Sequence, residues 1–325
     1  MDKTVLLTRL ELFSQCVENQ TAEINISLIN QSNQRKERYR GAVLNTSLND
    51  VGGAVKKTLA YIKEEVERRS LDVYDLVISL DDSVQTVPEA NVIHGAEIIS
   101  QLSVDCNGKD VVDEKTDLSK IRFMVMQVFD GASGDSLYLF SKYVQPATAY
   151  RTAEKYFLSG GVLRPFTKKV ITIRVAVDAF LIDGTYYVLH RNNFNSIFSY
   201  KDIYSRVIEN NIGTINQCGL MRDPARFIAD CESDGRYVGR LAKAILAKGF
   251  EEVAARKGSV KQIVDDFGLS LKITDTGEID YTGKEDIPVI LNLILRHYVI
   301  DALTNNKMIA AAIQEYQTLS DGGGR

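Results

Sequence analysis

The sequence predicts an α/β protein of the α+β kind, with an N-terminal mixed α/β domain at residues 1–118 and a C-terminal domain at residues 119–320, where a β-hairpin sheet precedes a helix-rich part. Apolar and β-branched residues run almost unbroken from Val170 to Ile182, which is typical of a strand covered on both faces. Asp183-Gly184 then predicts a two-residue hairpin turn, because this pair readily adopts the positive φ angles of such turns. After Asn193 the apolar spacing becomes three to four residues, which indicates a helix.

The N-terminal domain is predicted to contain one amphipathic helix among less regular regions. Val5–Leu28 has mixed apolar spacing that indicates strand and loop, and the polar run Asn30–Arg40 predicts an exposed basic loop. From Ala54 to Arg69, apolar residues recur every three or four positions, which predicts a helix with one packed and one charged face. A strand is expected at Val73–Leu80, and an apolar segment near Ile98–Leu102 precedes a turn-rich boundary between the domains.

The C-terminal domain is predicted to begin with a hairpin. Ile121–Asp130 and Asp135–Val144 are apolar runs separated by a short glycine-containing connection, so they are expected to pair as antiparallel strands. A polar helix is expected at Thr148–Leu158. The remaining predicted elements are helices at Asn193–Glu209, Pro224–Cys231, Arg236–Ala247, Val260–Phe267 and Ile287–Leu295, a hairpin of Leu271–Ile273 with Glu278–Tyr281, a strand at Tyr298–Leu303, and a last helix at Met308–Gln317 before a flexible tail at residues 321–325.

Length and composition describe an ordinary globular protein. With 325 residues and a hydrophobic fraction of 45%, the chain can bury a large core. Its apolar runs are shorter than the roughly 20 residues that a membrane-spanning helix needs. The N-terminus lacks the apolar stretch of a secretory signal, so we expect a cytoplasmic protein.

The sequence contains no familiar pattern of an enzyme or a metal site. The four cysteines and three histidines share no short spacing, which leaves a zinc site unsupported. Phosphate-binding glycine loops, the G-x-S-x-G elbow and the H-E-x-x-H zinc motif are all missing. These observations favour a non-enzymatic role and predict no cofactor and no bound metal.

The net charge of −4 conceals charges that are segregated along the chain. Residues 72–117 carry a net charge of −9, whereas Lys142–Arg174 carries +6 and Arg35–Arg69 carries +4. Because one molecule can present fields of opposite sign, an acidic protein can still have a basic binding face. A solvated charged surface is the simpler interpretation of the same pattern.

We select candidate DNA contacts from Lys142–Arg174, called here the basic stretch, and from one downstream helix. In the helix predicted at Arg236–Ala247, bases recur at spacings of four and three and so share one face, although a salt-bridged solvent face explains this spacing equally well. The candidates are Lys142, Arg151, Lys155, Arg164, Lys168, Lys169 and Arg174 in the stretch, with Arg236, Arg240 and Lys243 in the helix.

Two other functions remain open. Asp105 followed by Asp113-Glu114-Lys115 is the nearest pattern to a metal-dependent nuclease site, because carboxylates hold magnesium and a lysine stabilises charge on phosphate. A solvated acidic turn is the favoured interpretation of those residues. Alternatively, the chain is an adaptor whose charged faces bind proteins instead of DNA.

One stretch also resembles a known family. The residues FLIDGTYYVLHRNNFNSIFSY combine a strand, an Asp-Gly turn, a second strand and a polar pair that leads into an aromatic helix start. This pattern is similar to the KwaB-like family of bacterial proteins, named for the soluble component of the two-protein Kiwa anti-phage system. The order of the Ile287–Leu295 helix, the Tyr298–Leu303 segment and Thr304-Asn305-Asn306 is similar as well, so the resemblance covers roughly Ile121–Gln317.

The resemblance implies a cytoplasmic effector that binds DNA and associates with a multispanning membrane protein, KwaA, at the inner face of the cell membrane. Such an effector would interfere with phage DNA replication or expression. We expect a homodimer or higher homo-oligomer whose DNA affinity depends strongly on salt and little on sequence. No individual DNA contact is carried over from the family, so the candidate residues rest on charge alone.

Overall fold

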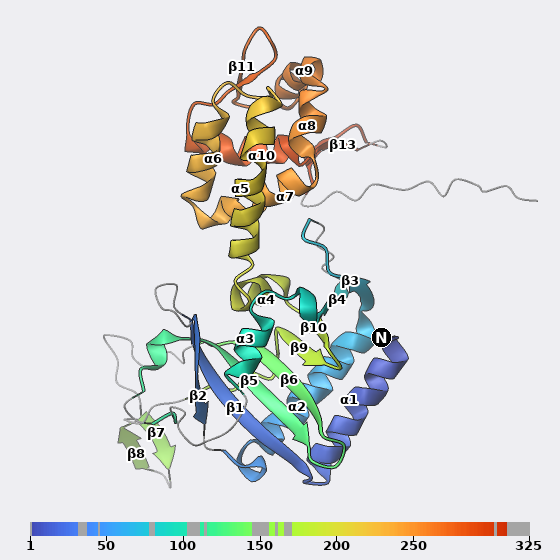
Figure 1. Ribbon diagram of the computed structural model, residues 1–325, viewed down its shortest axis with the longest axis vertical. Coiled ribbons are helices and arrows are strands. Elements are labelled where there is room, and N and C mark those ends of the chain that lie inside the picture. Colours follow the sequence, from blue (N-terminus) through green and yellow to red (C-terminus); the bar gives the residue numbers. More distant parts are fainter. Residues whose placement is uncertain are drawn as a thin grey trace, which may run out of the picture. The chain divides into compact units, whose positions relative to one another are not determined.

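The structure is a computed structural model that describes residues 2–31, 38–44, 46–77, 82–102, 111–113, 116–144, 171–301 and 304–310, and the backbone alone at 156–159 and 162–165 (Figure 1). The chain divides into two compact units. The first unit comprises Met1–Tyr74 and Leu80–Ser199, and the second comprises Asp75–Ser79 and Tyr200–Arg325.

An eight-stranded sheet forms the centre of the first unit. Its strand order is β2-β1-β5-β6-β9-β10-β4-β3, and neighbours are antiparallel except for the parallel pair β3 and β4. A separate two-stranded sheet joins β7 and β8. The strands are β1 (Ala22–Gln31), β2 (Tyr39–Leu44), β3 (Ser70–Val73), β4 (Ser83–Pro88), β5 (Ile121–Asp130), β6 (Asp135–Lys142), β7 (Tyr156–Ser159), β8 (Val162–Pro165), β9 (Ala179–Ile182) and β10 (Thr185–Val188).

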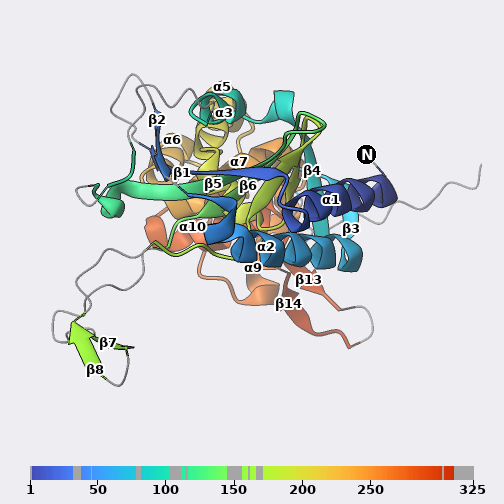
Figure 2. The ribbon, with the colours of Figure 1, turned by 90° about the horizontal axis from the view of Figure 1, so that it is seen from below.

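Two long helices cover one face of the sheet. Figure 2 shows α1 (Lys3–Glu18) and α2 (Leu48–Arg68) on that side of the sheet and α3 (Gly95–Ser100) on the other. Ser47 caps α2 through a reciprocal pair of hydrogen bonds with Asp50, which satisfies amide groups that a helix start leaves unpaired. Because strand side chains alternate between faces, every second strand residue meets these helices. The buried cluster includes Leu6, Leu10, Phe13 and Val17 of α1, Val55, Leu59, Ile62 and Val66 of α2, and Ile26, Met126, Leu139, Phe180 and Tyr187 of the strands.

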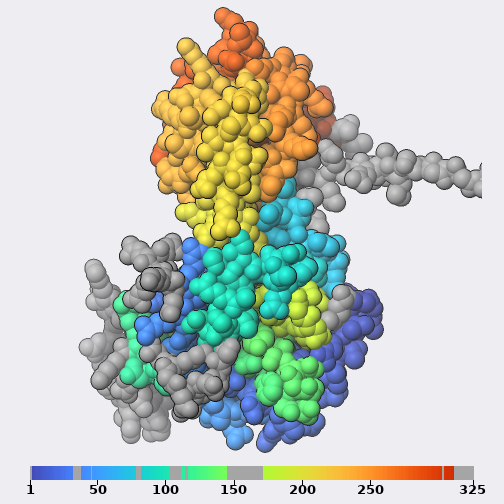
Figure 3. Space-filling view, in the orientation of Figure 1, coloured from blue at the N-terminus to red at the C-terminus, as the bar shows by residue number. Residues whose placement is uncertain are grey.

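Aromatic side chains fill the opposite face of the sheet. Phe198, which follows α4 (Arg191–Ile197), lies 5.3 Å from Phe140 of β6 and 5.0 Å from Tyr186 of β10 between ring centroids. The ring of Phe194 in α4 lies 4.7 Å from that of Phe198, with the ring planes tilted by 47°. Figure 3 shows α3 in teal at the surface over this side. The helix start that the sequence predicts after Asn193 is therefore a packing element of this aromatic layer.

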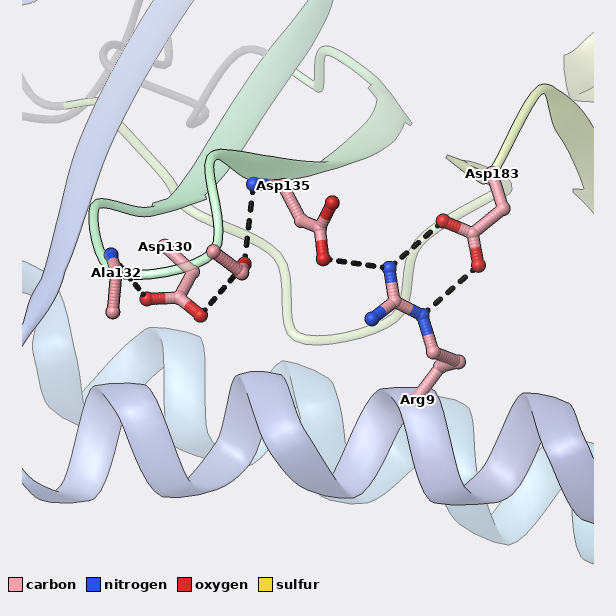
Figure 4. Close-up of polar contacts among 6 residues, drawn as sticks. Arg9, Asp130, Ala132, Asp135 and Asp183 are labelled. Atoms are coloured by element: carbon pink, nitrogen blue, oxygen red, sulfur yellow. Dashed lines mark hydrogen bonds and ion pairs between the residues drawn. The ribbon is translucent and has the colours of Figure 1, made fainter.

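Arg9 of α1 connects the tips of two hairpins (Figure 4). Its guanidinium reaches Asp183 in the β9–β10 turn and Asp135 at the start of β6. In the neighbouring β5–β6 turn, the carboxylate of Asp130 accepts a hydrogen bond from the amide of Ala132 at 3.0 Å. One helix side chain thus fixes the separation of two turns that are remote in sequence.

Six helices make up most of the described part of the second unit, seen from yellow to red in Figure 1. Helix α10 is apolar on most sides and packs against α7 and α8, with Ile290, Leu291 and Ile294 buried. The helices are α5 (Lys201–Gln217), α6 (Pro224–Glu232), α7 (Gly235–Leu246), α8 (Gly249–Ala254), α9 (Lys257–Phe267) and α10 (Ile287–Ile294). Two small hairpins pair β11 (Lys272–Ile273) with β12 (Ile279–Asp280) and β13 (Tyr298–Ile300) with β14 (Lys307–Ile309).

The predicted α/β fold class is confirmed, and so are several local elements. Asp183 and Gly184 have φ angles of 49° and 69° and join β9 to β10 as the expected hairpin turn. The hairpin of β5 and β6, the charged helix α2, the helices α6, α7, α9 and α10, and the hairpin of β11 and β12 also occur where the sequence predicts them. The single helix predicted at Asn193–Glu209 is instead two helices, α4 and α5, separated by Ser199, whose φ is 53°. The strand predicted at Tyr298–Leu303 is present as β13 over Tyr298–Ile300.

The long strand predicted at Val170–Ile182 is wrong over most of its length. Only Ala179–Ile182 is a strand, and residues 171–178 approach it without strand pairing. The carboxylate of Asp178 accepts the backbone N–H of Lys142 at 2.6 Å, which occupies the donor that a longer β9 would need. Ile171 and Ile173 instead pack against the core cluster as irregular chain, which explains their apolar character.

Four further predictions need correction. Val5–Leu28 begins with α1 rather than strand, because Leu6, Leu10, Phe13 and Val17 form one buried helical stripe. The strand predicted at Val73–Leu80 lies earlier, as β3 ends at Val73. Tyr156–Leu158 belongs to β7 instead of a helix, and Met308 and Ile309 belong to β14 instead of a last helix. The remainder of those two predicted helices, most of the Asn30–Arg40 loop and the tail lie outside the described residues.

The eight-stranded sheet takes strands from both sides of residue 118. Strands β1 to β4 precede that residue, and β5, β6, β9 and β10 follow it. The chain passes from one compact unit to the other at residues 74–75, 79–80 and 199–200.

Candidate anion-binding site

Asp178 is the buried centre of a polar site in the first unit. Its exposed fraction is 0%. One carboxylate oxygen accepts the amide of Lys142 at 2.6 Å, and the other accepts Nδ2 of Asn193 at 2.8 Å. Its backbone oxygen accepts the amides of Leu189 and His190 at 3.0 and 2.9 Å. Asp178 therefore joins the end of β6, the end of β10 and helix α4, and the hydrogen bonds offset the cost of burying its carboxylate.

Both ends of the basic stretch meet at this carboxylate. Arg174 lies on the chain that leads to β9, and its guanidinium nitrogen is 3.9 Å from Oδ2 of Asp178. Lys142 is the last residue of β6. Its backbone amide donates a hydrogen bond to the same oxygen of Asp178, and its side chain is exposed. Asp178 thus holds residues 142 and 174 close together although they are far apart in sequence.

A cavity of about 430 Å³ lies beside Asp178. Its described lining combines two arginines and a histidine with neutral polar and apolar side chains, and none of these residues carries a carboxylate. Two of its polar residues are nearly inaccessible, because Gln85 is 3% exposed and Ser83 is 5% exposed. The lining residues are Arg69, Ser83, Gln85, Val188, Leu189, His190, Arg191, Asn192 and Asn193.

Arg69 is held at the cavity by two groups. It donates to the backbone oxygen of Leu189 at 3.0 Å and forms an ion pair with Glu65. Glu65 also pairs with Arg68 at 2.8 Å, so one carboxylate faces two arginines. These contacts engage two of the five N–H groups that a guanidinium carries.

Arg191 is held by an aromatic ring and an amide. Its guanidinium lies 4.6 Å from the ring centroid of Tyr74 and donates to Oε1 of Gln85 at 3.4 Å. The hydroxyl of Tyr74 donates to Oδ1 of Asn195 at 2.6 Å, which fixes the ring against α4. Stacking of this kind orients the guanidinium plane while it remains charged.

Groups of both charges surround the cavity. The guanidinium groups of Arg69 and Arg191 line it, and the carboxylate of Glu65 pairs with Arg69. Farther out, Glu64 and Asp82 act on Arg68, and Asp178 lies beside Arg174. The hydroxyl of Tyr61, whose pKa burial and the nearby Glu65 raise, lies 3.2 Å from Nε2 of His190. The two lining arginines suit an anion.

Of the candidates in the basic stretch, Lys142 and Arg174 are brought together at Asp178. Arg151, Lys155, Lys168 and Lys169 lie outside the described residues, and Arg164 belongs to β8, where the backbone alone is described.

The three candidates on α7 have separate surroundings. Arg236 is exposed and pairs with Asp234, which lowers the pKa of that carboxyl to about 2. Arg240 is half-buried and donates to Oδ1 of Asn292 on α10 at 2.7 Å, and burial lowers its pKa. Lys243 is partly buried. Arg240 therefore serves packing between α7 and α10 rather than an open surface.

The carboxylates of the nuclease alternative are only partly described. Asp113 accepts hydrogen bonds from the amide and hydroxyl of Thr116 at 2.8 and 3.0 Å, which is a local turn. It lines a separate cavity of about 420 Å³ with Arg40, Asp117 and Lys120. Asp105, Glu114 and Lys115 lie outside the described residues. Within the described ranges, no three His, Cys, Asp or Glu residues are grouped to hold a metal ion.

Of this site, sequence analysis selected Lys142 and Arg174 but none of the residues that line the cavity. His190 and Arg191 follow the second strand of the hairpin and were not among the candidate residues, yet both line the cavity. Arg69, Ser83 and Gln85 carry no local signal, because they reach the cavity through pairing of β3, β4 and β10. Pairing between strands that are about 100 residues apart is not encoded in any short pattern.

Comparisons with known proteins identify one family. No curated protein and no solved structure matches the chain. Within the described part of the chain, no helix has the length and apolarity required to cross a membrane. The family model described as Kiwa protein KwaB-like matches residues 118–304, which begin before β5 and include Asp178, His190 and Arg191. Since this match covers more than half of the sequence, the chain belongs to the KwaB-like family of Kiwa anti-phage defence proteins.

Proposed function

We propose that this chain is a non-enzymatic DNA-binding component of Kiwa defence that contacts DNA phosphates without strong sequence preference. Together with a membrane partner, it would block phage replication or expression. Family membership supports the defence role, and the cationic surroundings of Asp178 support the choice of ligand.

The convergence of Lys142 and Arg174 on Asp178 carries the proposal. The stretch between them contains seven basic residues and one acidic residue. Asp178 anchors both ends of that stretch beside Arg69 and Arg191. A protein that neutralises DNA phosphates needs several cations that can reach one backbone path. Anchoring at one buried carboxylate brings Lys142 and Arg174, the two ends of the stretch, close to the arginines of the cavity.

The geometry also supports weak sequence preference. Guanidinium and ammonium groups bind phosphate oxygens, which are the same at every base pair, and such contacts position a protein without reading sequence. Each phosphate contact releases condensed counterions, so affinity should fall as salt rises.

A salt series with closed circular plasmid DNA tests the proposal. Wild-type protein should bind with a steep dependence on salt, and a Lys142→Gln, Arg174→Gln double variant should bind more weakly, with a salt slope reduced by about one to two. Lys56→Gln with Lys57→Gln is the matched control, because these exposed bases lie on the charged face of α2. Binding that is absent, or insensitive to salt, would exclude this function.

The same reactions test the enzymatic alternative. Adding magnesium and following the plasmid on a gel should show intact circles, because the proposed role includes no cleavage. Magnesium-dependent nicking that Asp113→Asn abolishes would instead establish the nuclease function.

We also propose a protein contact on the second unit. The β13–β14 hairpin exposes Ile300, Met308 and Ile309, whose exposed fractions are 51%, 50% and 64%. The register places Ile300 and Ile309 on one face of the hairpin and Met308 on the other. Exposed apolar side chains on a short hairpin are suited to a surface that another protein covers. We propose KwaA as the partner, recruiting the chain to the inner face of the membrane, and self-association into a homo-oligomer as a second contact.

Co-purification with KwaA and sedimentation of the chain alone separate those two contacts. A Met308→Asp, Ile309→Asp variant should lose co-purification if the hairpin meets KwaA, and should sediment as a smaller species if it meets a second copy. A variant that folds and changes neither measurement would remove this surface from the proposal.

A further inference from the structure

The cavity beside Asp178 differs from an open surface for a DNA backbone. It is a concavity of about 430 Å³, within the usual range for sites that enclose small ligands. A continuous nucleic-acid strand presents its phosphodiesters along a path, whereas a concavity accepts a group at the end of a molecule. The shape therefore favours a terminal group.

The lining of the cavity also favours a group with more than one negative charge. Arg69 and Arg191 contribute guanidinium groups, and among the described residues that line the cavity there is no carboxylate. A phosphate monoester carries about −1.5 to −2 charges near pH 7 and three acceptor oxygens, compared with a single charge on a phosphodiester. Two guanidinium groups in one open concavity match the monoester better.

The two arginines are pre-arranged for a ligand. Arg69 is fixed by Leu189 and Glu65, and Arg191 is fixed by Tyr74 and Gln85. Because the side chains are already held, binding loses little of their conformational freedom. The buried amide of Gln85 and hydroxyl of Ser83 add polar groups to the wall.

We infer that the Arg69–Arg191 cavity binds a terminal phosphate monoester, carried either by the 5′ end of a DNA strand or by a free mononucleotide. The inference shares its ligand chemistry with the proposed DNA binding but does not depend on it. Closed circular DNA has no phosphate monoester, so failure of the plasmid experiment and failure of this inference are separate results.

Binding measurements with paired ligands test the inference. Calorimetry on the full chain should detect dAMP but not deoxyadenosine, which lacks the phosphate. A short single-stranded oligonucleotide with a 5′ phosphate should bind at least 10-fold more tightly than the same oligonucleotide with a 5′ hydroxyl if the strand end is the source. Tight dAMP binding without that preference assigns the site to a free nucleotide, and either result supports a monoester site.

A variant series locates the binding at the cavity. Arg191→Gln should weaken binding of the monoester at least 10-fold, and Arg191→Lys should restore part of it, because the charge returns without the planar fork. Arg122→Gln is the matched control, since Arg122 is an exposed base on β5 away from the cavity lining. Thermal unfolding of each variant shows whether it is folded.

Two outcomes would overturn the inference. One is absence of dAMP binding together with equal affinity for the phosphorylated and hydroxyl oligonucleotides. The other is unchanged monoester affinity in folded Arg191→Gln and in folded Arg69→Gln.

Discussion

Arg9 and Asp183 form a two-pronged contact between a helix and a hairpin turn. Nε of Arg9 donates to Oδ2 of Asp183 at 2.9 Å, and a terminal nitrogen donates to Oδ1 at 2.9 Å. The same terminal nitrogen reaches Oδ2 of Asp135 at 2.9 Å. A paired arginine and carboxylate of this geometry is more specific than a single ion pair. The contact fixes α1 to the β9–β10 turn, which lies within the residues that match the family model.

Replacing Arg9 with Met should destabilise the first unit. The difference in unfolding free energy between the variant and wild type should depend on pH. The hydrogen bond from Arg9 lowers the pKa of Asp135, so the contact contributes stability above the unfolded pKa of about 3.9. That contribution is lost as pH falls through the lower folded pKa. Urea unfolding of wild type and Arg9→Met should differ at pH 7 and converge below about pH 4. Curves that stay equally separated down to pH 2 would contradict this origin.

Removing the carboxylate of Asp178 should have a large effect on folding. Asp178→Ala leaves the Lys142 amide, the Asn193 amide group and Arg174 without their buried acceptor, which costs on the order of 3–5 kcal/mol. Asp178→Asn retains one acceptor oxygen and should cost less, about 1–3 kcal/mol. Glu23→Gln, an exposed change on β1, should stay within about 0.5 kcal/mol and serves as the control in chemical unfolding. If Asp178→Ala were as stable as the control, the carboxylate of Asp178 would not be needed for folding.

Gly249 occupies a position where a side chain has no room. A Cβ at this residue would overlap the carbonyl oxygen of Ile294 and lie 2.7 Å from its Cγ2, between α8 and α10. Gly249→Ala should therefore destabilise the second unit by about 1–3 kcal/mol. Gly213→Ala is the opposite case, because nothing lies within 4 Å of its Cβ in α5, and it should stabilise by about 0.5–1 kcal/mol. Thermal unfolding midpoints that move in the same direction would refute the packing argument.

The second unit should lose stability in mildly acidic solution through His297. Burial, together with the charges of Arg240 and Lys243, lowers the pKa of His297 below its usual value near 6.5. The unfolded chain then takes up a proton more readily than the folded one, so stability declines as pH falls from about 6.5 through the folded pKa. His297→Gln should reduce this decline between pH 7.5 and 5, measured by urea unfolding. A parallel decline in both proteins would assign the effect to another group.

Local chemistry explains which elements the sequence predicted. Asp183-Gly184 needs only its own φ preferences to form a hairpin turn, and α2 needs only its apolar spacing and the Ser47 cap. The stretch before β9 was mispredicted because buried apolar residues occur in irregular chain as well as in strands. At Asp178 the decisive event is a side-chain hydrogen bond to a different strand, which no periodicity records.

The candidate site shows the same limit. Charge segregation identified Lys142 and Arg174, because a run of bases is visible in any sequence. The sequence predicts Arg69 on a charged helix face. In the structure, contacts with Glu65 and with the backbone oxygen of Leu189 hold it at the cavity. Arg240 shares its helix with exposed bases, yet its contact with Asn292 depends on how α7 and α10 pack.

The strand order also governs how a new chain acquires its sheet. Pro88 of β4 pairs with Thr185 of β10, while β3 pairs on the other edge of β4. At synthesis rates of about 5–20 residues per second, the ribosome needs roughly 5–20 s to pass from one of these residues to the other. During that interval β4 has an unpaired edge towards the missing strand, and unpaired edges invite wrong partners. A nascent chain is therefore most prone to misassembly before the β9–β10 hairpin emerges from the ribosome. Its dependence on chaperones should be greatest at that stage.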